Sequence, residues 1–356
     1  FENRSPTMWP IGWSLLMVPF YWIGGLETLY WAAPIFAALA LAGTWALSNE
    51  ILRSEDRSVR WGVAALACVL VATSPEGSER MLVPMADAAA QLFTVLTLWL
   101  LLRARRRRPA LHAALAGMSL GTAYFIRHPQ LPLILSAATT ALLTFVQGER
   151  SGREKNAWQQ SLIVLGPFAG AALVVALPDL LYHQRVFGSW LRAESSEWFL
   201  ISIRHIGRSL FAVVEQGLLR REELGFVAPF AAYGAWQLWQ RHRRPALIMG
   251  TGIAAVFIFH LFYAALRPRD LIAIWPALYL CAAYGLIRAW QLLVSRRSVA
   301  TSLLLFYCAL LLSARSMRTL AMPWRDDVIT FGHVSAAQRR AFDTLWQETP
   351  SEAVVA

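Results

Sequence analysis

The chain has 356 residues, of which 57% are hydrophobic and only 15% are charged, and its mean hydropathy is +0.44. A soluble domain averages about 25% charged residues. This composition therefore excludes a disordered chain, disfavours a soluble enzyme and indicates an integral membrane protein. The net charge of +11 rests almost entirely on arginine, because Lys155 is the only lysine. Such a basic balance is interpreted first against the membrane and only then against nucleic acid.

The first apolar run, residues 9–24, differs from the later ones in composition. It holds Pro10 and Pro19 and is rich in Trp and Tyr, and aromatic side chains at this density favour the headgroup zone of a membrane. We predict an interfacial or re-entrant helix here. The sequence starts at Phe1 without the basic segment and cleavage site of a signal peptide, and we expect a piece of a longer protein.

Beyond this run, charged residues divide the sequence into long apolar stretches. A helix needs about 20 such residues to cross the hydrocarbon. We therefore predict an all-α fold, a polytopic transmembrane helix bundle with about ten spans. The predicted spans are 29–48, 61–75, 87–102, 110–126, 130–147, 158–181, 224–240, 246–266, 271–293 and 299–318.

Two regions stand apart from these spans. Residues 182–223 mix aromatic and charged side chains, which is typical of an outer amphipathic lid over a cavity and equally of a plain interfacial connector. Residues 319–356 turn polar, and we expect them to begin an extracytoplasmic C-terminal region. The transmembrane domain is accordingly predicted to cover residues 1–318.

Positive charge alternates between successive connections, and this alternation predicts the orientation. The connections 49–60, 103–109, 148–157, 241–245 and 294–298 carry 16 Lys and Arg in 39 residues, whereas the other set carries 10 in 60. Positive loops stay on the cytoplasmic side, so the first set is predicted to be cytoplasmic. We interpret the arginine run 103–108 as a topology signal rather than as a site for nucleic acid or anionic lipid.

Carboxylates gather at the outer ends of spans, where ionisable residues of membrane proteins often have a function. Asp87 opens a span, and Glu76 and Glu79 lie in the loop before it. A carboxylate there can orient an acceptor hydroxyl or hold a metal. The alternative for Asp87 is a helix N-terminal carboxylate stabilised by the helix dipole. We take these three residues as candidate catalytic carboxylates and leave the metal open.

Basic side chains lie at the same predicted outer ends. Arginine binds phosphate oxygens in a planar, bidentate manner, so several outer arginines near carboxylates suit an anionic lipid-phosphate substrate. The alternative is interfacial snorkelling of each long side chain. The candidate phosphate-binding residues are Arg80, Arg127, His128, Arg267 and Arg269.

Four stretches in chain order resemble the GT-C membrane glycosyltransferases, of the protein O-mannosyltransferase and aminoarabinose-transferase kind. The first is similar to a Pro-rich juxtamembrane helix and the second to an acidic motif that opens a span. The third is similar to a Gly-bearing helix that ends in a basic residue, and the last to a late helix with an Arg and a Pro. They are Trp9–Leu16, Pro84–Asp87, Leu115–Arg127 and Arg269–Leu278.

The resemblance implies transfer of a sugar from a polyprenyl-phosphate donor to a lipid, glycan or protein acceptor on the outer face of the membrane. The arginine-rich, lysine-poor composition indicates a GC-rich bacterial gene, and we therefore expect the plasma (inner) membrane of a bacterium. It also implies a catalytic carboxylate in a first outer loop, which with a first span is expected to precede residue 9. Asp87 matches the second acidic motif of these enzymes. Asp270 stands where they usually have Tyr.

The leading hypothesis is therefore a multi-pass glycosyltransferase whose partners are a lipid-linked sugar donor, membrane lipids and an acceptor, without nucleic acid. A divalent metal is a further cofactor to consider. One alternative is a polytopic transporter or lipid-linked-sugar flippase. Charges that avoid the midplane and halves that do not repeat disfavour transport. A second alternative is a non-catalytic relative.

Overall fold

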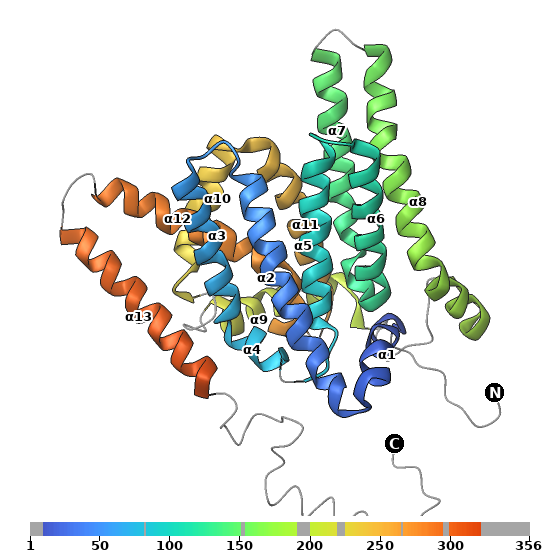
Figure 1. Ribbon diagram of the computed structural model, residues 1–356, viewed down its shortest axis with the longest axis horizontal. Coiled ribbons are helices and arrows are strands. Elements are labelled where there is room, and N and C mark those ends of the chain that lie inside the picture. The colour runs from blue at the N-terminus through green and yellow to red at the C-terminus, as the bar shows by residue number, and fades with distance from the viewer. Residues whose placement is uncertain are drawn as a thin grey trace, which may run out of the picture.

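In a computed structural model the chain is a bundle of helices (Figure 1), and the structure describes residues 10–81, 83–150, 154–190, 200–218, 225–264, 266–294 and 299–321. The α-helices are α1 Gly12–Gly24, α2 Ala32–Ile51, α3 Arg57–Ala72, α4 Pro75–Met81, α5 Asp87–Ala104, α6 Pro109–Ile126, α7 Ile134–Arg150, α8 Glu154–Phe187, α9 Ile206–Ala212, α10 Ala228–Arg241, α11 Arg243–Leu261, α12 Trp275–Val294 and α13 Val299–Ala321. The shorter elements are 3-10 helices η1 Glu27–Trp31, η2 His128–Leu133, η4 Ile203–His205 and η7 Pro268–Ile274, and the π-helix η5 Val213–Leu218.

The all-α prediction is confirmed. In the described residues, β structure is limited to one isolated bridge between Ile201 and Tyr263. In the part of the chain that the structure describes, six helical segments are long and apolar enough to cross a membrane, and a seventh is obtained if α3 and α4, bent by 63°, count as one broken span. Each of the ten predicted spans overlaps one of the long helices.

The end of α8 differs from the prediction. The helix runs on to Phe187, so the first residues of the predicted outer loop 182–223 are helical. The helix continues through Pro178. It ends at Gly188, whose φ of 68° is left-handed and favours glycine. The rest of that loop is described only in part, and the predicted region 319–356 lies outside the described residues beyond position 321.

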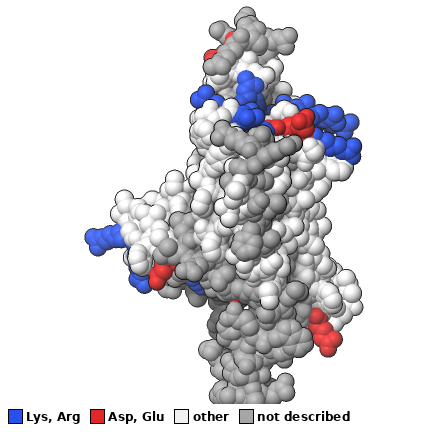
Figure 2. All heavy atoms as spheres, turned by 90° about the vertical axis from the view of Figure 1, so that its left-hand side faces the viewer, with Lys and Arg blue, Asp and Glu red and all other residues white. Residues whose placement is uncertain are grey.

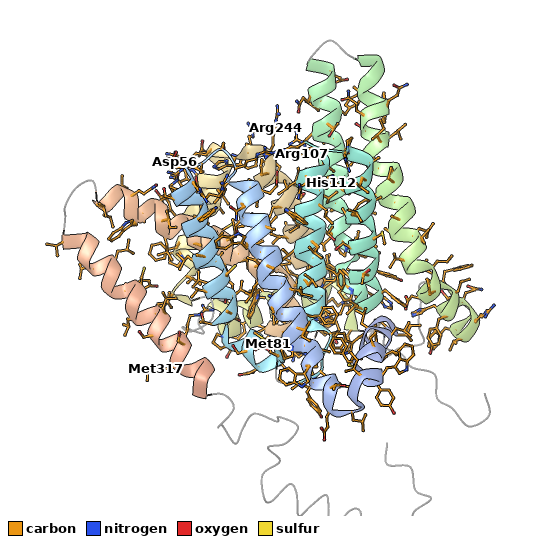
Figure 3. The ribbon with its side chains drawn as sticks, in the orientation of Figure 1. Asp56, Met81, Arg107, His112, Arg244 and Met317 are labelled. Atoms are coloured by element: carbon orange, nitrogen blue, oxygen red, sulfur yellow. The ribbon has the colours of Figure 1, made fainter. Side chains whose placement is uncertain are left out.

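The two ends of the bundle differ in charge. In Figure 3, Asp56, Arg107, His112 and Arg244 lie at one end, whereas Met81 lies at the other. We call the first the arginine-rich end; it comprises loops 52–56 and 105–108 and the junction of α10 and α11. Figure 2 shows the largest visible group of basic side chains at this end, above a band of uncharged ones. Three of the basic connections, 49–60, 103–109 and 241–245, thus share one end in the described part of the chain, in agreement with the alternation.

Helices α5 and α12 form the centre of the bundle, and α8 lies at its edge. In the apolar windows of the corresponding spans, 78% and 89% of residues are buried for α5 and α12, against 17% for α8. The exposed Leu162, Leu173 and Val174 of α8 fit contact with lipid rather than water. The central helices are therefore enclosed by protein, and the outer face of the edge helix contacts hydrocarbon.

Glycines allow some helices to pack with backbone contact. A Cβ at Gly117 of α6 would lie 2.0 Å from the carbonyl oxygen of Phe168 on α8, and one at Gly12 of α1 would lie 2.3 Å from that of Phe125. Small residues serve helix association in membranes in this way. In addition, the Trp13 indole donates a hydrogen bond of 2.8 Å to the Pro84 carbonyl. Helix α1 is thus fixed against the segments that begin α5 and end α6.

Candidate active site

Two buried carboxylates and one arginine join three distant segments at the end of the bundle opposite the arginine-rich end. Asp87 and Asp270 are 5% and 3% exposed. The Arg127 guanidinium donates through one terminal nitrogen to Asp87 Oδ1 and through the other to Asp270 Oδ1 at 3.0 Å. Because both contacts are charge-assisted and shielded from water, they fix the side chain of Arg127 in one position.

Local structure explains how each of these side chains reaches the others. Asp87 is the first residue of α5, where a carboxylate is favoured by the helix dipole. Arg127 follows the last residue of α6 in an extended conformation, with φ −148° and ψ 104°. This extended backbone between α6 and η2 directs the side chain of Arg127 toward α5 and η7.

Asp270 also caps its own helix. One oxygen, Oδ2, accepts hydrogen bonds from the backbone N–H of Arg267 at 2.9 Å and from its Nε at 3.2 Å. This is one half of the capping box found at the start of η7, which satisfies an otherwise orphaned donor. Asp270 therefore serves two purposes, since its other oxygen receives Arg127.

Further arginines surround this pair of carboxylates. Arg269 interacts electrostatically with Arg267, Asp270, Asp87 and Arg80, so the predicted phosphate-binding arginines, Arg127 included, belong to one charged neighbourhood. The side chain of Arg267 remains 47% exposed. We call the set Asp87, Arg127, Arg267, Arg269 and Asp270 the charge cluster.

The other predicted carboxylates have different surroundings. Glu76 is buried and accepts hydrogen bonds of 3.0 and 2.7 Å from Nε and a terminal nitrogen of Arg80, one turn along α4. Glu79 is half-buried on the same helix, and its side chain makes no hydrogen bond or ion pair within the described part of the chain. Glu76 thus holds Arg80 in place, whereas nothing ties Glu79 to the charge cluster.

His128 has a partner outside the charge cluster. Its Nε2 lies 2.8 Å from Oδ2 of Asp179 on α8, and His183 Nε2 lies 4.0 Å from the other oxygen of the same carboxylate. The ligand atoms of these three residues all lie within 4.8 Å of one another, close enough to hold a metal ion. His183 stands four residues after Asp179, so the two side chains lie on one helical face.

Comparison with known proteins identifies the fold. Residues 23–174 match the family model of the dolichyl-phosphate-mannose-protein mannosyltransferases. ArnT from Cupriavidus metallidurans, bound to undecaprenyl phosphate, superposes with a TM-score of 0.56 at 16% identity, over 94% of this chain and 58% of that one. The Archaeoglobus fulgidus oligosaccharyltransferase superposes with a TM-score of 0.53 at 14% identity, over 99% of this chain and 54% of that one. No curated protein matches the sequence.

The chain has the GT-C fold. The expected resemblance to GT-C membrane glycosyltransferases is confirmed at this level, and the chain is an integral membrane protein. A further structure of the archaeal protein, AglB in complex with an inhibitory peptide and a dolichol-phosphate, agrees with a TM-score of 0.54 at 14% identity, over 98% of this chain and 51% of that one. The GT-C chain described here thus spans little more than half the length of the structures it matches.

Two carboxylates of this GT-C chain were not among the predicted site residues. Asp179 is fully buried. The sequence does single out Asp179, because this residue directly follows the uncharged run 156–178 and a lone carboxylate in a membrane span is unusual. Asp270 had been noted only as a departure from a family motif. Its role as the second acceptor for Arg127 depends on tertiary structure, which no sequence pattern encodes.

A further carboxylate, the partly buried Glu55, lies at the arginine-rich end. Its Oε1 accepts hydrogen bonds from Arg288 and from the Tyr284 hydroxyl at 2.8 Å, and it lies 2.8 Å from His242 Nε2. Burial raises the pKa of Glu55, but these hydrogen bonds outweigh burial and hold the pKa below its usual range. The loop 52–56 is thereby fastened to α11 and α12, far from the charge cluster.

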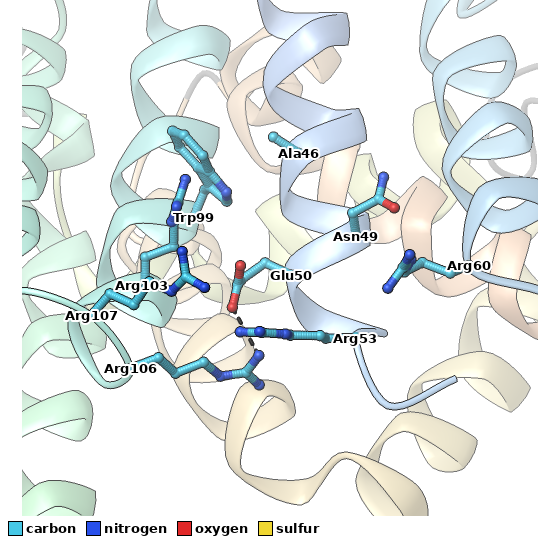
Figure 4. A pocket seen from close by; sticks show the side chains of 9 residues that line it. All are labelled: Ala46, Asn49, Glu50, Arg53, Arg60, Trp99, Arg103, Arg106 and Arg107. Carbon is cyan, nitrogen blue, oxygen red and sulfur yellow. Dashed lines mark hydrogen bonds and ion pairs between the residues drawn. The ribbon is translucent and has the colours of Figure 1, made fainter. Parts of the chain in front are cut away.

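A pocket of about 390 Å³ opens at the same end (Figure 4). It lies between the ends of α2 and α5 and the start of α3. Glu50 is its single carboxylate and pairs with Arg106 at 2.9 Å. The lining residues are Ala46, Asn49, Glu50, Arg53, Arg60, Trp99, Arg103, Arg106 and Arg107.

Proposed function

We propose that this GT-C chain is the membrane part of a glycosyltransferase that moves a sugar from a polyprenyl-phosphate donor to an acceptor. The observation that carries the proposal is Arg127, held between two buried carboxylates with further arginines around it. Such a cluster suits the phosphate of a lipid donor. The fold shared with ArnT bound to undecaprenyl phosphate and with AglB bound to dolichol-phosphate supports this substrate class.

The arginines have separate roles. Both terminal nitrogens of Arg127 already donate to carboxylates, so we assign it the task of fixing the carboxylates and the local positive charge. Arg267 is the most exposed member of the cluster, and Arg269 is half-buried beside it. We assign these two side chains the direct contacts to the donor phosphate. Their charge stabilises the phosphate as it departs.

The reaction requires a proton acceptor as well. The acceptor hydroxyl attacks the anomeric carbon, the bond from that carbon to the phosphate oxygen breaks with its electron pair, and the hydroxyl proton is lost to a base. Asp87 has one oxygen committed to Arg127, so we assign it to positioning that arginine. We expect the base in the outer loop that, by the resemblance, precedes residue 9.

The proposal also covers the membrane face on which the charge cluster lies, the acceptor and a metal. The described basic connections gather at the opposite end, which by the positive-inside rule supports an outward-facing charge cluster, and we propose the outer face of the inner membrane as its location. The acceptor is a lipid, a glycan or a protein. If the transfer uses a divalent metal, the free oxygen of Asp87 is within the site to bind it.

Transfer from a labelled polyprenyl-phosphate sugar, measured with the full-length protein in membranes, tests the proposal. Replacing one preorganised donor to a developing charge costs about 100- to 1000-fold in rate. We expect a loss of this order for Arg269→Ala and for Arg127→Ala. Glu149→Gln, an exposed carboxylate at the arginine-rich end, serves as the matched control and should keep the wild-type rate.

Two results would overturn the proposal. If Arg127→Ala and Arg269→Ala both transfer sugar at the wild-type rate, the site assignment is wrong. If the protein consumes no polyprenyl-phosphate sugar but moves it across proteoliposome membranes, the protein is a flippase and the reaction class is wrong.

A further inference from the structure

A cluster of two histidines and one aspartate lies outside the charge cluster. His128 opens η2, directly after α6, and Asp179 and His183 stand one turn apart near the end of α8. His128 is 51 positions from Asp179, and it meets the other two residues because α6 and α8 pack closely at Gly117. The Tyr124 ring covers His128, with ring centroids 4.7 Å apart. The cluster is therefore built on rigid, packed helices.

The cluster has unsatisfied polar atoms. Asp179 is fully buried and His183 is 3% exposed. Within the described residues, Oδ1 of Asp179 and Nδ1 of His183 have no hydrogen-bond partner. A buried polar atom without a partner costs about 1–3 kcal/mol. The contact between His128 and Asp179 accounts for Oδ2 alone, so hydrogen bonding within the cluster does not explain why these residues are placed together.

We propose that His128, Asp179 and His183 form a binding site for a divalent transition metal of the zinc type. Two imidazoles and one carboxylate are a ligand set that Zn²⁺ accepts, with a water molecule in the fourth tetrahedral position. The side chain of His128 is 30% exposed, which leaves a path for the ion. The nitrogen ligands favour zinc over Mg²⁺, which prefers oxygen.

The existing distances are compatible with such an ion. Ligand atoms around tetrahedral Zn²⁺ lie about 2.0–2.2 Å from the metal, and here they are within 4.8 Å of one another. Small side-chain rotations are therefore enough to converge on one point. Binding would replace the proton shared by His128 and Asp179 and would neutralise the buried carboxylate. The bound ion would also fix the backbone that carries Arg127, the neighbour of His128.

Metal analysis of the purified full-length protein tests this site without an activity assay. After incubation with Zn²⁺ and removal of free ion, we expect about one zinc per chain, and Co²⁺ in its place should give the visible absorption of a tetrahedral site. His128→Ala and His183→Ala should each weaken zinc binding by more than about tenfold. Even the loss of a residue that only hydrogen-bonds to a metal ligand weakens metal binding by about 10- to 100-fold. His112→Ala, a partly exposed histidine at the arginine-rich end, should keep wild-type binding.

Zinc titration of the folded wild-type protein against a chelator provides a second measurement that does not depend on how well a variant folds. Stoichiometric uptake that competes with Mn²⁺ but not with Mg²⁺ supports the site. No uptake by the wild-type protein, or equal uptake by the His128→Ala and His183→Ala variants, overturns it. Because sugar transfer is not measured, these results are independent of the proposed function.

The pocket at the arginine-rich end carries a second inference from a different observation. Five of its nine lining residues are arginines, and Glu50 neutralises only Arg106. Within the described residues, Arg53, Arg60 and Arg107 make no ion pair, and the buried Nε of Arg60 has no hydrogen-bond partner. Figure 4 shows these guanidinium groups around the single carboxylate. The pocket therefore has an uncompensated positive charge.

Its surroundings indicate a ligand at the membrane surface. The partly exposed Trp45 and Trp61 lie beside it on α2 and α3, with ring centroids 6.2 Å apart. Tryptophan is enriched at the boundary between membrane and water, and basic pockets between helices bind phospholipid headgroups. We propose that this pocket binds the phosphate group of an anionic ligand, with an anionic phospholipid as its source. Part of the arginine run 103–108, which was interpreted from the sequence as a topology signal, then also belongs to a lipid site.

Thermal unfolding of the detergent-solubilised protein distinguishes the sources of that phosphate. We expect cardiolipin or phosphatidylglycerol to raise the melting temperature more than phosphatidylcholine does, and Arg53→Gln with Arg60→Gln to abolish the difference. The charge-matched control is Arg241→Gln with Arg243→Gln, which lie outside the pocket. Equal stabilisation by inorganic phosphate identifies a soluble ligand and overturns the lipid source. Equal effects of all lipids, or an unchanged response of the pocket variant, overturn the site.

Discussion

Arg127 and Asp270 are separated by 143 positions in the sequence, yet a guanidinium nitrogen of one lies 3.0 Å from a carboxylate oxygen of the other. The same arginine reaches Asp87 through its second terminal nitrogen. One cation is thus shared by two carboxylates that are almost fully buried. The stability of this end of the bundle depends on the balance of those charges.

From this balance we expect that losing Arg127 alone destabilises the protein more than removing the charges of Arg127, Asp87 and Asp270 together. Arg127→Met leaves Asp87 without its cation and Asp270 with Arg267 alone, and breaking a buried ion pair costs about 3–5 kcal/mol. Combining it with Asp87→Asn and Asp270→Asn removes the uncompensated charges, so the triple variant should be more stable than the single one. Unfolding in mixed micelles measures the difference, with the exposed Arg208→Met as control. A triple variant less stable than Arg127→Met would contradict this account.

The sequence predicted where the charge cluster lies but not how it is connected. Alternate connections of a helix bundle share one end, so the apolar runs alone place Asp87, Arg127 and Asp270 on the same side. Their pairing depends on rotamers and on the lateral order of α5, α6 and η7. Neither is visible as a periodic pattern along the chain.

The histidine cluster shows a different limit. The spacing of Asp179 and His183 on one helical face is readable from the sequence once the helix is known to continue past Pro178. The predicted span ended before His183, and this hid the pair. His128 is 51 positions from Asp179, and only the close packing of α6 on α8 brings it there.

That packing yields the second prediction. A Cβ at Gly117 would lie 2.0 Å from the backbone carbonyl of Phe168, which cannot move without shifting α8, whereas a Cβ at Gly170 meets nothing within 4 Å. Gly117→Ala should therefore cost about 1–3 kcal/mol, as overpacking does. Gly170→Ala should be neutral or gain up to about 1 kcal/mol of helix propensity. Thermal melts of both variants check this, and equal melting temperatures would contradict the close approach.

The third prediction concerns pH. Hydrogen bonds from His242, Tyr284 and Arg288 hold the pKa of Glu55 below its usual range despite the opposing effect of burial. The unfolded chain therefore binds a proton at Glu55 before the folded protein does, so this stabilisation is complete above about pH 4.3, the ordinary value. It is lost as the pH falls through the lowered pKa.

Unfolding from pH 7 down to about pH 3 measures this effect as the difference between wild-type and Glu55→Gln protein. The wild-type advantage should shrink below the ordinary glutamate value. Glu149→Gln, at an exposed position, should show no such pH-dependent difference. An advantage that stays constant or grows on acidification would mean that the ionised form of Glu55 is not the stabilising one.

The fourth prediction concerns a buried arginine on α13. Arg315 is fully buried and donates hydrogen bonds of 2.7 Å to the Leu70 carbonyl, 3.2 Å to the Thr73 carbonyl and 3.2 Å to the Tyr279 hydroxyl. Its guanidinium carbon also lies 4.9 Å from the centre of the Tyr279 ring. The planar fork thus joins α13 to the end of α3 and to α12.

Lysine keeps the charge of Arg315 but lacks this geometry. Arg315→Lys should therefore leave at least one of these acceptors unpaired, at a cost of about 1.5–3 kcal/mol, the range for hydrogen bonds to charged groups. Met317→Ala on the same helix, at a side chain that is 72% exposed, should change stability little. Limited proteolysis gives a local measurement, because α13 should become accessible to protease in Arg315→Lys before the rest of the bundle unfolds. If Arg315→Lys is as stable and as protected as Met317→Ala, the charge alone holds α13 and the hydrogen-bond geometry is not required.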